Sequence, residues 1–247
     1  MSSAEVLAVI PARWKSQRFP GKPVALIARV PMIVRVWRQV AQAKTVHGVV
    51  VATDDERIAS VCRDHGVACE MTSPDHATGT DRLAEVASRQ GAEVYVNVQG
   101  DEPIIQPQSI DAVVTCLLAA RGRGIHISTG YIEGATPEQE ASASCVHLVP
   151  TMDQCVLTFS RLPIPMSFRE PFRRNVHVGL YAFTASALRQ FATWEQGPVE
   201  RAESIELIRF LEHGQRIACI PIPAGSIGVD HVEDIARVEA VLAKRSQ

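Results

Sequence analysis

Val6-Leu-Ala-Val-Ile10 is a short, continuously apolar run, followed directly by the polar segment Pro11-Ala-Arg-Trp-Lys-Ser-Gln-Arg-Phe-Pro-Gly-Lys-Pro23. A continuous rather than alternating apolar run is typical of a strand buried on both faces of a parallel sheet. Two further runs of this kind, Val49–Ala52 and Val94–Val98, alternate with segments of helical spacing. This order predicts a βαβαβ unit with helices covering a parallel sheet. The expected helices occupy Pro31–Lys44, Glu56–Gly66 and Thr80–Gln90.

The pattern changes after about Ile105, where strand-like runs follow one another with few helices between them. We therefore expect an α/β fold with a doubly wound, mostly parallel sheet and a smaller β-rich lobe. The chain is interpreted as a single domain, 1–247, with a nucleotide-type half, 1–105, and a second half, 106–247. The expected elements of the second half are helices at Pro107–Ala120, Glu200–His213 and His231–Ala243, and strands at Ile125–Tyr131, Cys145–Val149, Val156–Ser160, Val176–Phe183 and Arg216–Pro221.

Composition excludes several classes of protein. The 247 residues include 25 basic and 27 acidic side chains, a net charge of −2, so no basic excess points to nucleic acid. The longest apolar runs fall far short of the roughly 20 residues of a membrane-spanning helix. Basic residues follow the first apolar run, the wrong order for a signal peptide, and we expect a cytoplasmic protein. The six cysteines form no Cys-x-x-Cys pair, so neither a zinc site nor a redox dithiol is indicated.

The segment after the first strand concentrates positive charge, with Arg13, Lys15, Arg18 and Lys22 within ten positions. Ligands of open α/β sheets bind at the carboxyl ends of strands. The segment matches neither Gly-x-Gly-x-x-Gly nor the Walker lysine motif. Arginine and lysine at a strand end nevertheless suit a triphosphate, and Gly21 allows the backbone to approach it closely. A solvated basic loop is the alternative.

Two acids end separate segments and are candidates for a metal site. Asp101 follows the strand-like run that ends at Val98, and Asp230 ends Gly225-Ser-Ile-Gly-Val-Asp230. Carboxylates placed this way can hold magnesium against phosphate oxygens. The alternatives are a turn or cap for Asp101, and a capping box of Asp230 with Glu233 for the last helix.

Four blocks of sequence resemble the CMP-Kdo synthetases (3-deoxy-manno-octulosonate cytidylyltransferases), which are sugar nucleotidyltransferases. The blocks span nearly the whole chain in the family's order. They are Ile10-Pro-Ala-Arg13 with Arg18-Phe-Pro-Gly-Lys-Pro23, Asp75-His-Ala-Thr-Gly-Thr-Asp-Arg82, Asn97-Val-Gln-Gly-Asp-Glu-Pro103, and Gly228-Val-Asp230 with Glu233-Asp234.

The resemblance implies a fold like that of nucleotide-diphospho-sugar transferases and transfer of CMP from CTP to an acidic acceptor, Kdo, with release of pyrophosphate. It further implies magnesium and a homodimer, and composition adds the expectation of no nucleic-acid or membrane partner. Arg13 and Lys22, together with Asp101 and Asp230, would be catalytic, and the two aspartates would hold the magnesium. The implied nucleotide-binding residues are Pro11, Ala12, Arg13, Arg18, Lys22, Thr78, Gly79, Arg82 and Gln99, and the implied acceptor-binding residues are Arg161, His177, Tyr181 and Glu206.

On spacing alone, three of the acceptor-side assignments have simpler interpretations. His177 could be an ordinary sheet histidine and Tyr181 a core residue. The acidic series Glu200, Glu203 and Glu206 is typical of the solvated face of a helix.

The acceptor half departs from the family pattern. The segment between Ile164-Pro165 and His177 is shorter than expected, Leu207 stands where a polar residue is usual, and Cys145-Val-His147 replaces a usual Val-Lys. Losing a partner for the acceptor's hydroxyls would weaken its binding. A second hypothesis therefore keeps CMP transfer but directs it to a phosphonate or another small acid. A third, a non-catalytic nucleotide-binding protein, predicts the loss of Lys22, Asp101 or Asp230, and all three are present.

Overall fold

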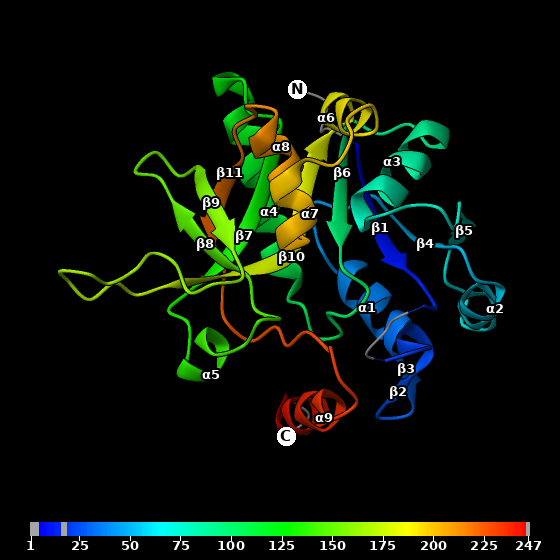
Figure 1. Cartoon of the computed structure of the whole chain (residues 1–247). Coiled ribbons are helices and arrows are strands. Elements are labelled where there is room, and N and C mark those ends of the chain that lie inside the picture. The colour runs from blue at the N-terminus through cyan, green and yellow to red at the C-terminus, as the bar shows by residue number, and fades with distance from the viewer. Residues whose placement is uncertain (1–4, 16–18, 246–247) are drawn as a thin grey trace. The chain divides into compact units, whose positions relative to one another are not determined.

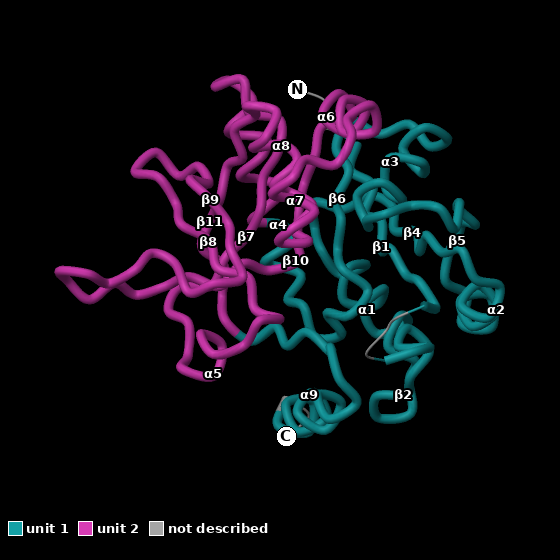
Figure 2. The backbone as a smooth tube through the Cα atoms, viewed as in Figure 1, with its two compact units in different colours: residues 1–111, 225–247 teal, residues 112–224 magenta. Residues whose placement is uncertain are grey.

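A computed structural model describes residues 5–15 and 19–245 of the chain. It contains two compact units, shown in separate colours in Figure 2. Unit 1 comprises Met1–Asp111 and Gly225–Gln247, and unit 2 comprises Ala112–Ala224. The carboxy-terminal segment thus groups with the first part of the chain, and the first unit extends through residue 111 before the chain enters the second.

Unit 1 is built on a parallel sheet of the order β6-β1-β4-β5 (Figure 1). Its strands are β1 (Val6–Ala12), β4 (Gly48–Thr53), β5 (Cys69–Met71) and β6 (Val94–Val98), and its sheet-covering helices are α1 (Met32–Val40), α2 (Glu56–Asp64) and α3 (Gly79–Arg89). The predicted βαβαβ alternation is confirmed, and every residue of β6 is buried, as the continuous apolar run indicates. β5 is a short strand that the sequence analysis did not predict.

The order of these strands places a topological switch between β1 and β6. The chain moves outward from β1 through β4 to β5 and then returns to the other side of β1 as β6. Connections that leave two neighbouring strands in opposite directions open a crevice at their carboxyl ends, where ligands of such sheets bind. β1 ends at Ala12 and β6 at Val98, so the motifs after these strands border that crevice.

Local signals explain where the helices begin. The Asp55 side chain accepts a hydrogen bond from the Arg57 amide and caps α2. Thr78 caps α3 through a capping box with Asp81, in which each side chain accepts from the other's backbone amide. These caps satisfy amides that have no partner inside their helix. They also hold the chain immediately after β4 and immediately before α3.

A separate apolar cluster joins the chain's last helix to unit 1. Buried Ile27, Met32, Ile104, Val229 and Val238 form its centre. Ile27 belongs to the hairpin of β2 (Leu26–Ile27) and β3 (Val30–Pro31), which follows η1 (Lys22–Val24), and Met32 begins α1. Ile104 lies between β6 and the next helix, Val229 precedes α9 (Asp234–Arg245), and Val238 lies within it. Burying each such side chain contributes about 1.5–3 kcal/mol. The cluster therefore accounts for the grouping of 225–247 with unit 1.

Unit 2 contains a mixed sheet. β10 pairs antiparallel with β7 and β8, β8 pairs antiparallel with β9, and β11 runs parallel to β7. Helix α4 begins in unit 1 and continues into unit 2. The elements are α4 (Pro107–Ala120), η2 (Arg121–Arg123), β7 (Ile127–Glu133), α5 (Pro137–Glu140), β8 (His147–Pro150), β9 (Val156–Ser160), β10 (Asn175–Thr184), α6 (Ala185–Phe191), α7 (Pro198–Glu203), α8 (Ile208–Glu212) and β11 (Ala218–Pro221).

One predicted helix was wrong. Glu200–His213 is not continuous but divides into α7 and α8, because Ser204 adopts a left-handed backbone with φ 52°. A non-glycine residue in this region interrupts the helical hydrogen-bond series. The carbonyls of Glu203 and Ser204 instead accept hydrogen bonds from Arg161.

No helix within the described residues is long and apolar enough to cross a membrane.

Candidate active site

A pocket of unit 1 lies at the carboxyl ends of β1 and β6. It combines the β1 end, the start of η1 and the turn after β6 with one residue from the segment before α9. The residues that line it are Pro11, Ala12, Arg13, Lys22, Pro23, Gln99, Gly100, Asp101 and Asp230. Three segments that are far apart in the sequence thus meet at the switch point of the sheet.

Lys22 joins two of these segments. Its Nζ donates to the Asp101 carboxylate at 2.6 Å and to the Val229 carbonyl at 2.8 Å. The Val229 amide in turn donates to the Asp101 carbonyl at 2.9 Å. The Lys22 side chain is only 15% exposed, so this charge-assisted contact is partly shielded from water. A cation and a carboxylate are therefore held together at the pocket wall.

Two glycines allow the pocket walls to approach each other. A Cβ on Gly100 would lie 2.7 Å from the Pro11 carbonyl oxygen, which no side chain tolerates without a backbone shift. A Cβ on Gly79 would lie 3.1 Å from the Pro11 ring and 3.4 Å from the Gln99 amide nitrogen. The start of α3 thus packs directly against two pocket residues, although Gly79 does not itself line the pocket.

Negative charge accumulates beside Asp101. Burial, together with the charges of Asp101 and Asp230, raises the pKa of Glu102 to about 7. Ser226 donates a hydrogen bond to the same carboxylate, which partly offsets the rise. Three carboxyl groups therefore influence one another at this end of the pocket, and they favour the approach of a cation.

The segment before α9 directs Asp230 toward the pocket. The Asp234 carboxylate accepts hydrogen bonds from the Asp230 and His231 amides at 3.0 and 2.9 Å, and α9 begins at Asp234. The alternative of a capping box between Asp230 and Glu233 is therefore wrong, because Asp234 supplies the carboxylate that closes this turn. Asp230 instead lines the pocket.

The oxygen donors of the pocket fit magnesium. Mg²⁺ is commonly bound by one or two carboxylates together with substrate phosphates and water. Asp101 and Asp230 both line the pocket, so the pocket itself presents two carboxylates of this kind. Within the described part of the chain, no group of three or more His, Cys, Asp or Glu side chains is arranged as a complete metal site. The two carboxylates thus suit a metal whose remaining ligands come from phosphate oxygens and water.

The basic loop after β1 is anchored at Trp14. The Trp14 carbonyl accepts a hydrogen bond from the Gly21 amide at 3.1 Å, and Gly21 has a left-handed backbone with φ 72°. A Cβ on Gly21 would approach the Trp14 ring to 3.1 Å. The Arg57 guanidinium covers the same ring at 3.6 Å from its centroid. Arg13 is exposed and lines the pocket, while Arg18 lies outside the described residues.

In unit 2, Arg161 ties together three segments of its own unit. Its Nε donates to the Glu203 carbonyl at 2.6 Å, and its two terminal nitrogens donate to the carbonyls of Ala143, Ser144 and Ser204. Every guanidinium nitrogen therefore has a backbone partner.

His177 is a neutral, buried side chain on β10. The Thr129 hydroxyl donates its single hydrogen to the Leu180 carbonyl, so in its 2.9 Å contact with His177 it accepts from Nε2. This assigns the proton to Nε2 and leaves Nδ1 as an acceptor. Burial lowers the pKa of His177 to about 3, and the buried Tyr181 ring stacks on the imidazole.

The solvated-face interpretation of the acidic series was wrong for two of its members. Glu200 is 1% exposed and forms a bidentate pair with Arg209, with both nitrogen–oxygen distances at 2.7 Å. Glu206 is also buried, in the connection between α7 and α8. Helical spacing misled here because the helix breaks at Ser204, so the two residues do not share one helix face. Leu207 is fully buried as well.

Comparison with known proteins agrees with this geometry. A family model described as cytidylyltransferase matches residues 7–217. The chain belongs to the cytidylyltransferase family. It is 43% identical to a 3-deoxy-manno-octulosonate cytidylyltransferase of Geobacter sulfurreducens over 94% of this chain and 97% of that one. A second relative of the same name, from Myxococcus xanthus, is 39% identical over 99% of both chains.

Solved structures extend the comparison. A CMP:2-keto-3-deoxy-manno-octonic acid synthetase complexed with CTP superposes with a TM-score of 0.90 at 34% identity, covering 98% of this chain and 100% of that one. A glucose-1-phosphate thymidylyltransferase from Bacillus anthracis, so named provisionally, shares the fold alone, with a TM-score of 0.68 at 14% identity over 96% and 94% of the two chains. The predicted family, α/β fold class and nucleotidyltransferase activity are thereby confirmed.

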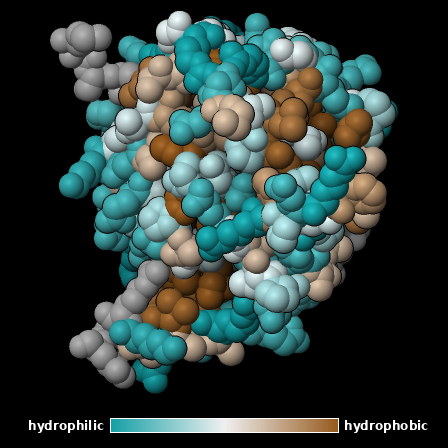
Figure 3. Space-filling view, turned by 90° about the vertical axis from the view of Figure 1, so that its left-hand side faces the viewer, coloured by the Kyte–Doolittle hydropathy of each residue, from teal (hydrophilic) through white to brown (hydrophobic). Residues whose placement is uncertain are grey.

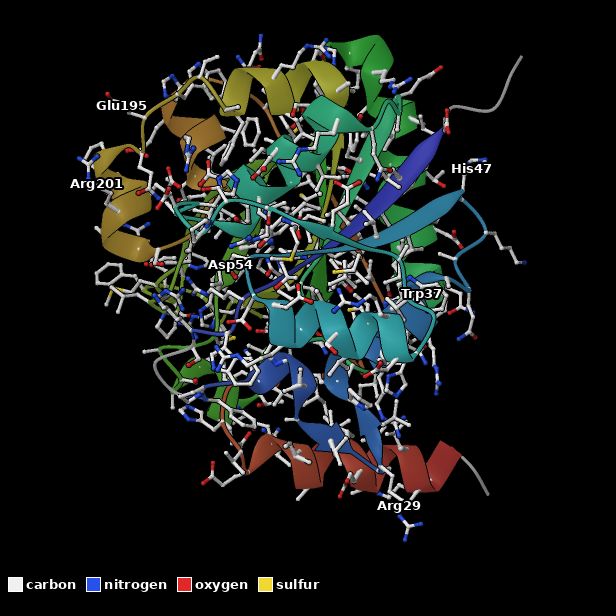
Figure 4. The ribbon with its side chains drawn as sticks, turned by 90° about the vertical axis from the view of Figure 1, so that its right-hand side faces the viewer. Arg29, Trp37, His47, Asp54, Glu195 and Arg201 are labelled. Carbon is white, nitrogen blue, oxygen red and sulfur yellow. The ribbon has the colours of Figure 1, made fainter. Side chains whose placement is uncertain are left out.

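The cytidylyltransferase pocket unites much of the predicted nucleotide set with the two predicted metal ligands. Pro11, Ala12, Arg13, Lys22, Gln99, Asp101 and Asp230 all line it. Thr78 and Arg82 are not among its described lining residues. The Thr78 hydroxyl serves in the cap of α3, and Arg82 is buried against Thr72, Ser73 and Asp54, which follows β4 and is labelled in Figure 4.

Sequence reasoning missed two lining residues, Gly100 and Pro23. Both stand inside blocks that were recognised, but small apolar residues between charged ones carry no chemical signal of their own. The close approach of Gly100 to Pro11 becomes visible only once the neighbouring strands are known.

Proposed function

We propose that this cytidylyltransferase transfers CMP from CTP to 3-deoxy-manno-octulosonate (Kdo). An acceptor oxygen attacks the α-phosphorus of CTP, a new phosphorus–oxygen bond forms, and the bond to the pyrophosphate leaving group breaks. The acceptor's proton passes to solvent. The products are CMP-Kdo and pyrophosphate.

The observation that carries the proposal is the pocket at the β1 and β6 ends, which combines Arg13, Lys22, Asp101 and Asp230. Phosphoryl-type transfer depends mainly on positioning and on neutralising charge, and this set can do both. The printed names of relatives about 40% identical over nearly the whole chain support Kdo as acceptor, and the similar synthetase complexed with CTP supports the donor.

In this mechanism the basic residues act on the triphosphate. Arg13 and Lys22 bind its oxygens, and Arg18 of the same loop would join them. In the free protein the Lys22 Nζ already donates to the Asp101 carboxylate at 2.6 Å. When the triphosphate binds, the ammonium therefore has to divide its hydrogen bonds between this carboxylate and the phosphate oxygens. Pro11 and Ala12 line the same pocket. In this proposal Thr78, Gly79, Arg82 and Gln99 receive the base and ribose.

Asp101 and Asp230 would hold magnesium, which when bound supplies charge neutralisation on the phosphates. Their two carboxylates line one pocket. Lys22 keeps Asp101 oriented by its hydrogen bond.

Arg161, His177, Tyr181 and Glu206 are the acceptor residues of this proposal. Neutral His177 can accept a hydrogen bond from an acceptor hydroxyl through Nδ1, beside the stacked ring of Tyr181. Arg161 would pair with the acceptor carboxylate by exchanging some of its contacts with backbone carbonyls. The burial of Glu206 would make its charge effective for orienting a polyol.

We also propose that the enzyme works in the cytoplasm as a homodimer, with unit 2 at the interface. Exposed apolar side chains of unit 2 support the dimer. They are Leu157 on β9, and Leu162, Met166, Phe168 and Phe172 in the segment before β10. Figure 3 shows hydrophobic residues exposed at several places on the face turned to the viewer. Light scattering should give about twice the chain mass, and Phe168→Glu with Leu157→Glu should lower it. A monomeric wild type would overturn the dimer.

Pyrophosphate release from CTP with magnesium tests the function. The panel of acceptors is Kdo, sialic acids, phosphonates and phosphonocarboxylates. Release with Kdo and CMP-Kdo as the product support the proposal. Release with a phosphonate but not with Kdo would overturn the acceptor while retaining CMP transfer, and no release with any acceptor would overturn the enzymatic function.

A further inference from the structure

The chain that leads into α3 is held by α3 itself. Strand β5 ends at Met71, and the segment Thr72–Ala77 connects it to the cap residue Thr78. One face of α3 presents Arg82, Glu85 and Arg89, spaced by three and four residues, so they lie one above the other. All three side chains bond to the connecting segment or to the residue before it.

Glu85 makes the central contacts. Its Oε2 accepts a hydrogen bond from the Ser73 amide at 2.9 Å and also contacts His76 Nε2. Arg89 pairs with the other carboxylate oxygen and donates to the Met71 carbonyl at 2.8 Å. Arg82 donates to the Thr72 hydroxyl and to the Ser73 carbonyl. The Thr72 amide still donates to the Thr53 carbonyl of β4 at 2.8 Å, and beyond Thr72 the segment is held mainly by these side chains of α3.

The charge state of Glu85 agrees with this arrangement. Burial raises its pKa, but the hydrogen bonds from Ser73 and His76 and the charge of Arg89 outweigh burial, so the pKa lies below its ordinary value. Its side chain is 18% exposed. An ionised carboxylate accepts hydrogen bonds more strongly than a neutral one.

The far end of the held segment adjoins residues that pack against the pocket wall. Thr78 and Gly79 follow it directly, and Gly79 packs so tightly that a Cβ would lie 3.1 Å from Pro11 and 3.4 Å from Gln99. A displacement of the segment would therefore move the backbone that borders two pocket residues. None of the contacts of Glu85 reaches the pocket itself, so its effect would be indirect.

We propose that Glu85 is a positioning residue for nucleotide selection, because it fixes Ser73 and His76 and so sets where Thr78 and Gly79 meet the base and ribose. This inference rests on the proposed function in taking CTP as the nucleotide and in placing its base and ribose beside Thr78 and Gly79. It assigns no contact between Glu85 and substrate. Its consequence is that discrimination between cytosine and uracil depends on a side chain outside the pocket.

The test compares Glu85→Ala and Glu85→Gln with the wild type. Glu195→Ala is the matched control, because Glu195 is an exposed carboxylate that points away from the protein in Figure 4. Calorimetry gives the affinity for CTP and UTP without acceptor, and pyrophosphate release gives kcat and KM. We expect Glu85→Ala to weaken CTP binding about tenfold, with kcat changed less than about threefold, because charge-assisted hydrogen bonds are lost.

The preference for CTP over UTP should fall at least about threefold in the same variant. Glu85→Gln retains an acceptor oxygen, so it should restore part of the CTP affinity and of the preference. Glu195→Ala should match the wild type in both. Hydrogen exchange provides an independent readout, since the Ser73 amide loses its acceptor and should exchange faster in Glu85→Ala.

The outcomes separate the two proposals. If Kdo gives no pyrophosphate but Glu85→Ala still weakens CTP binding and lowers the preference, the acceptor is wrong and the role of Glu85 stands. If Kdo is active and Glu85→Ala merely lowers the melting temperature, with CTP affinity and preference unchanged, Glu85 is only structural and the inference is overturned. Unchanged exchange at Ser73 would also overturn it.

Discussion

In unit 1, charged side chains line a pocket, whereas in unit 2 several charged side chains are bonded to other residues of the same unit. In unit 1, Lys22, Asp101 and Asp230 come from three separate segments and line one cavity. In unit 2, Arg161 is bonded to backbone carbonyls and Glu200 is paired with Arg209. The contrast teaches that the strand-end rule locates residues that line a pocket, while the predicted acceptor residues of the irregular segments are engaged in structural contacts.

The largest expected effect concerns Asp101. Asp101→Asn removes the charge that would hold magnesium and that compensates Lys22 Nζ at 2.6 Å. We expect kcat/KM for pyrophosphate release to fall at least about 1,000-fold, with the fold retained.

Steady-state kinetics and circular dichroism measure these two quantities. The matched control is Asp64→Asn, an exposed aspartate at the end of α2. If Asp101→Asn kept activity within about tenfold of the wild type, the metal site would have to be sought elsewhere and the comparison between the units would lose its main support.

The next prediction concerns the approach of the two strand ends. Gly100→Ala places a Cβ 2.7 Å from the Pro11 carbonyl oxygen, so the turn after β6 must shift. We expect a loss of about 1–3 kcal/mol in the free energy of unfolding from overpacking, and KM for CTP about tenfold higher.

Gly91→Ala is the control, because nothing lies within 4 Å of its added Cβ. Urea unfolding and initial-rate kinetics would measure both variants. Equal behaviour of the two would mean that the strand ends relax freely and that the pocket does not depend on their close approach.

Much of unit 1 could be predicted because its signals are local. The apolar runs mark β1, β4 and β6, and the charged residues directly after them fall in the pocket once the strands are parallel neighbours. The resemblance of the sequence blocks to the family added the base-side residues. What could not be predicted is the close packing of Gly100, since it depends on the distance between strands.

Unit 2 resisted prediction for physical reasons. The left-handed backbone of Ser204 breaks the predicted helix. The break could not be predicted, because a left-handed residue leaves no signal in the spacing of apolar residues. Glu200 looks solvated until its partner Arg209 is found nine positions later, with both side chains almost fully buried. Such pairs are tertiary, so periodicity within one element does not reveal them.

The pH dependence of stability provides a smaller test, and it concerns unit 2. The pKa of His177 is about 3 in the folded protein and about 6.5 when unfolded. Below pH 6.5 the unfolded chain binds the proton first, so the free energy of unfolding decreases as the pH falls toward 3. Above pH 6.5 this contribution is complete.

His177→Gln can still donate to Thr129 but has no proton to bind in this range. Between about pH 6 and pH 4, we expect stability to fall less steeply in this variant, by up to about 1.4 kcal/mol per pH unit. Burial also lowers the pKa of His147, and that histidine is present in both proteins, so the difference between them isolates His177. Parallel curves in urea unfolding would contradict a neutral, buried His177.

The smallest expected effect is at Arg57, which would show how far the anchoring of the basic loop matters to unit 1. Its guanidinium is held by Asp55 at 2.8 and 2.7 Å and covers the Trp14 ring. Trp14 in turn packs on Gly21, next to Lys22. Because Arg57 is largely exposed, Arg57→Ala should raise KM for CTP only about two- to threefold, with kcat unchanged.

Arg63→Ala serves as the control for Arg57→Ala, since it removes an exposed arginine of the same helix that pairs with Glu56. Lysine cannot reproduce the two contacts with Asp55, so Arg57→Lys should resemble Arg57→Ala rather than the wild type. In Trp14→Leu the ring is already gone, so adding Arg57→Ala should change KM no further. Additive effects would mean that Arg57 acts on the pocket by its charge alone. The basic loop would then depend on Gly21 and Lys22 themselves, and not on a support from α2.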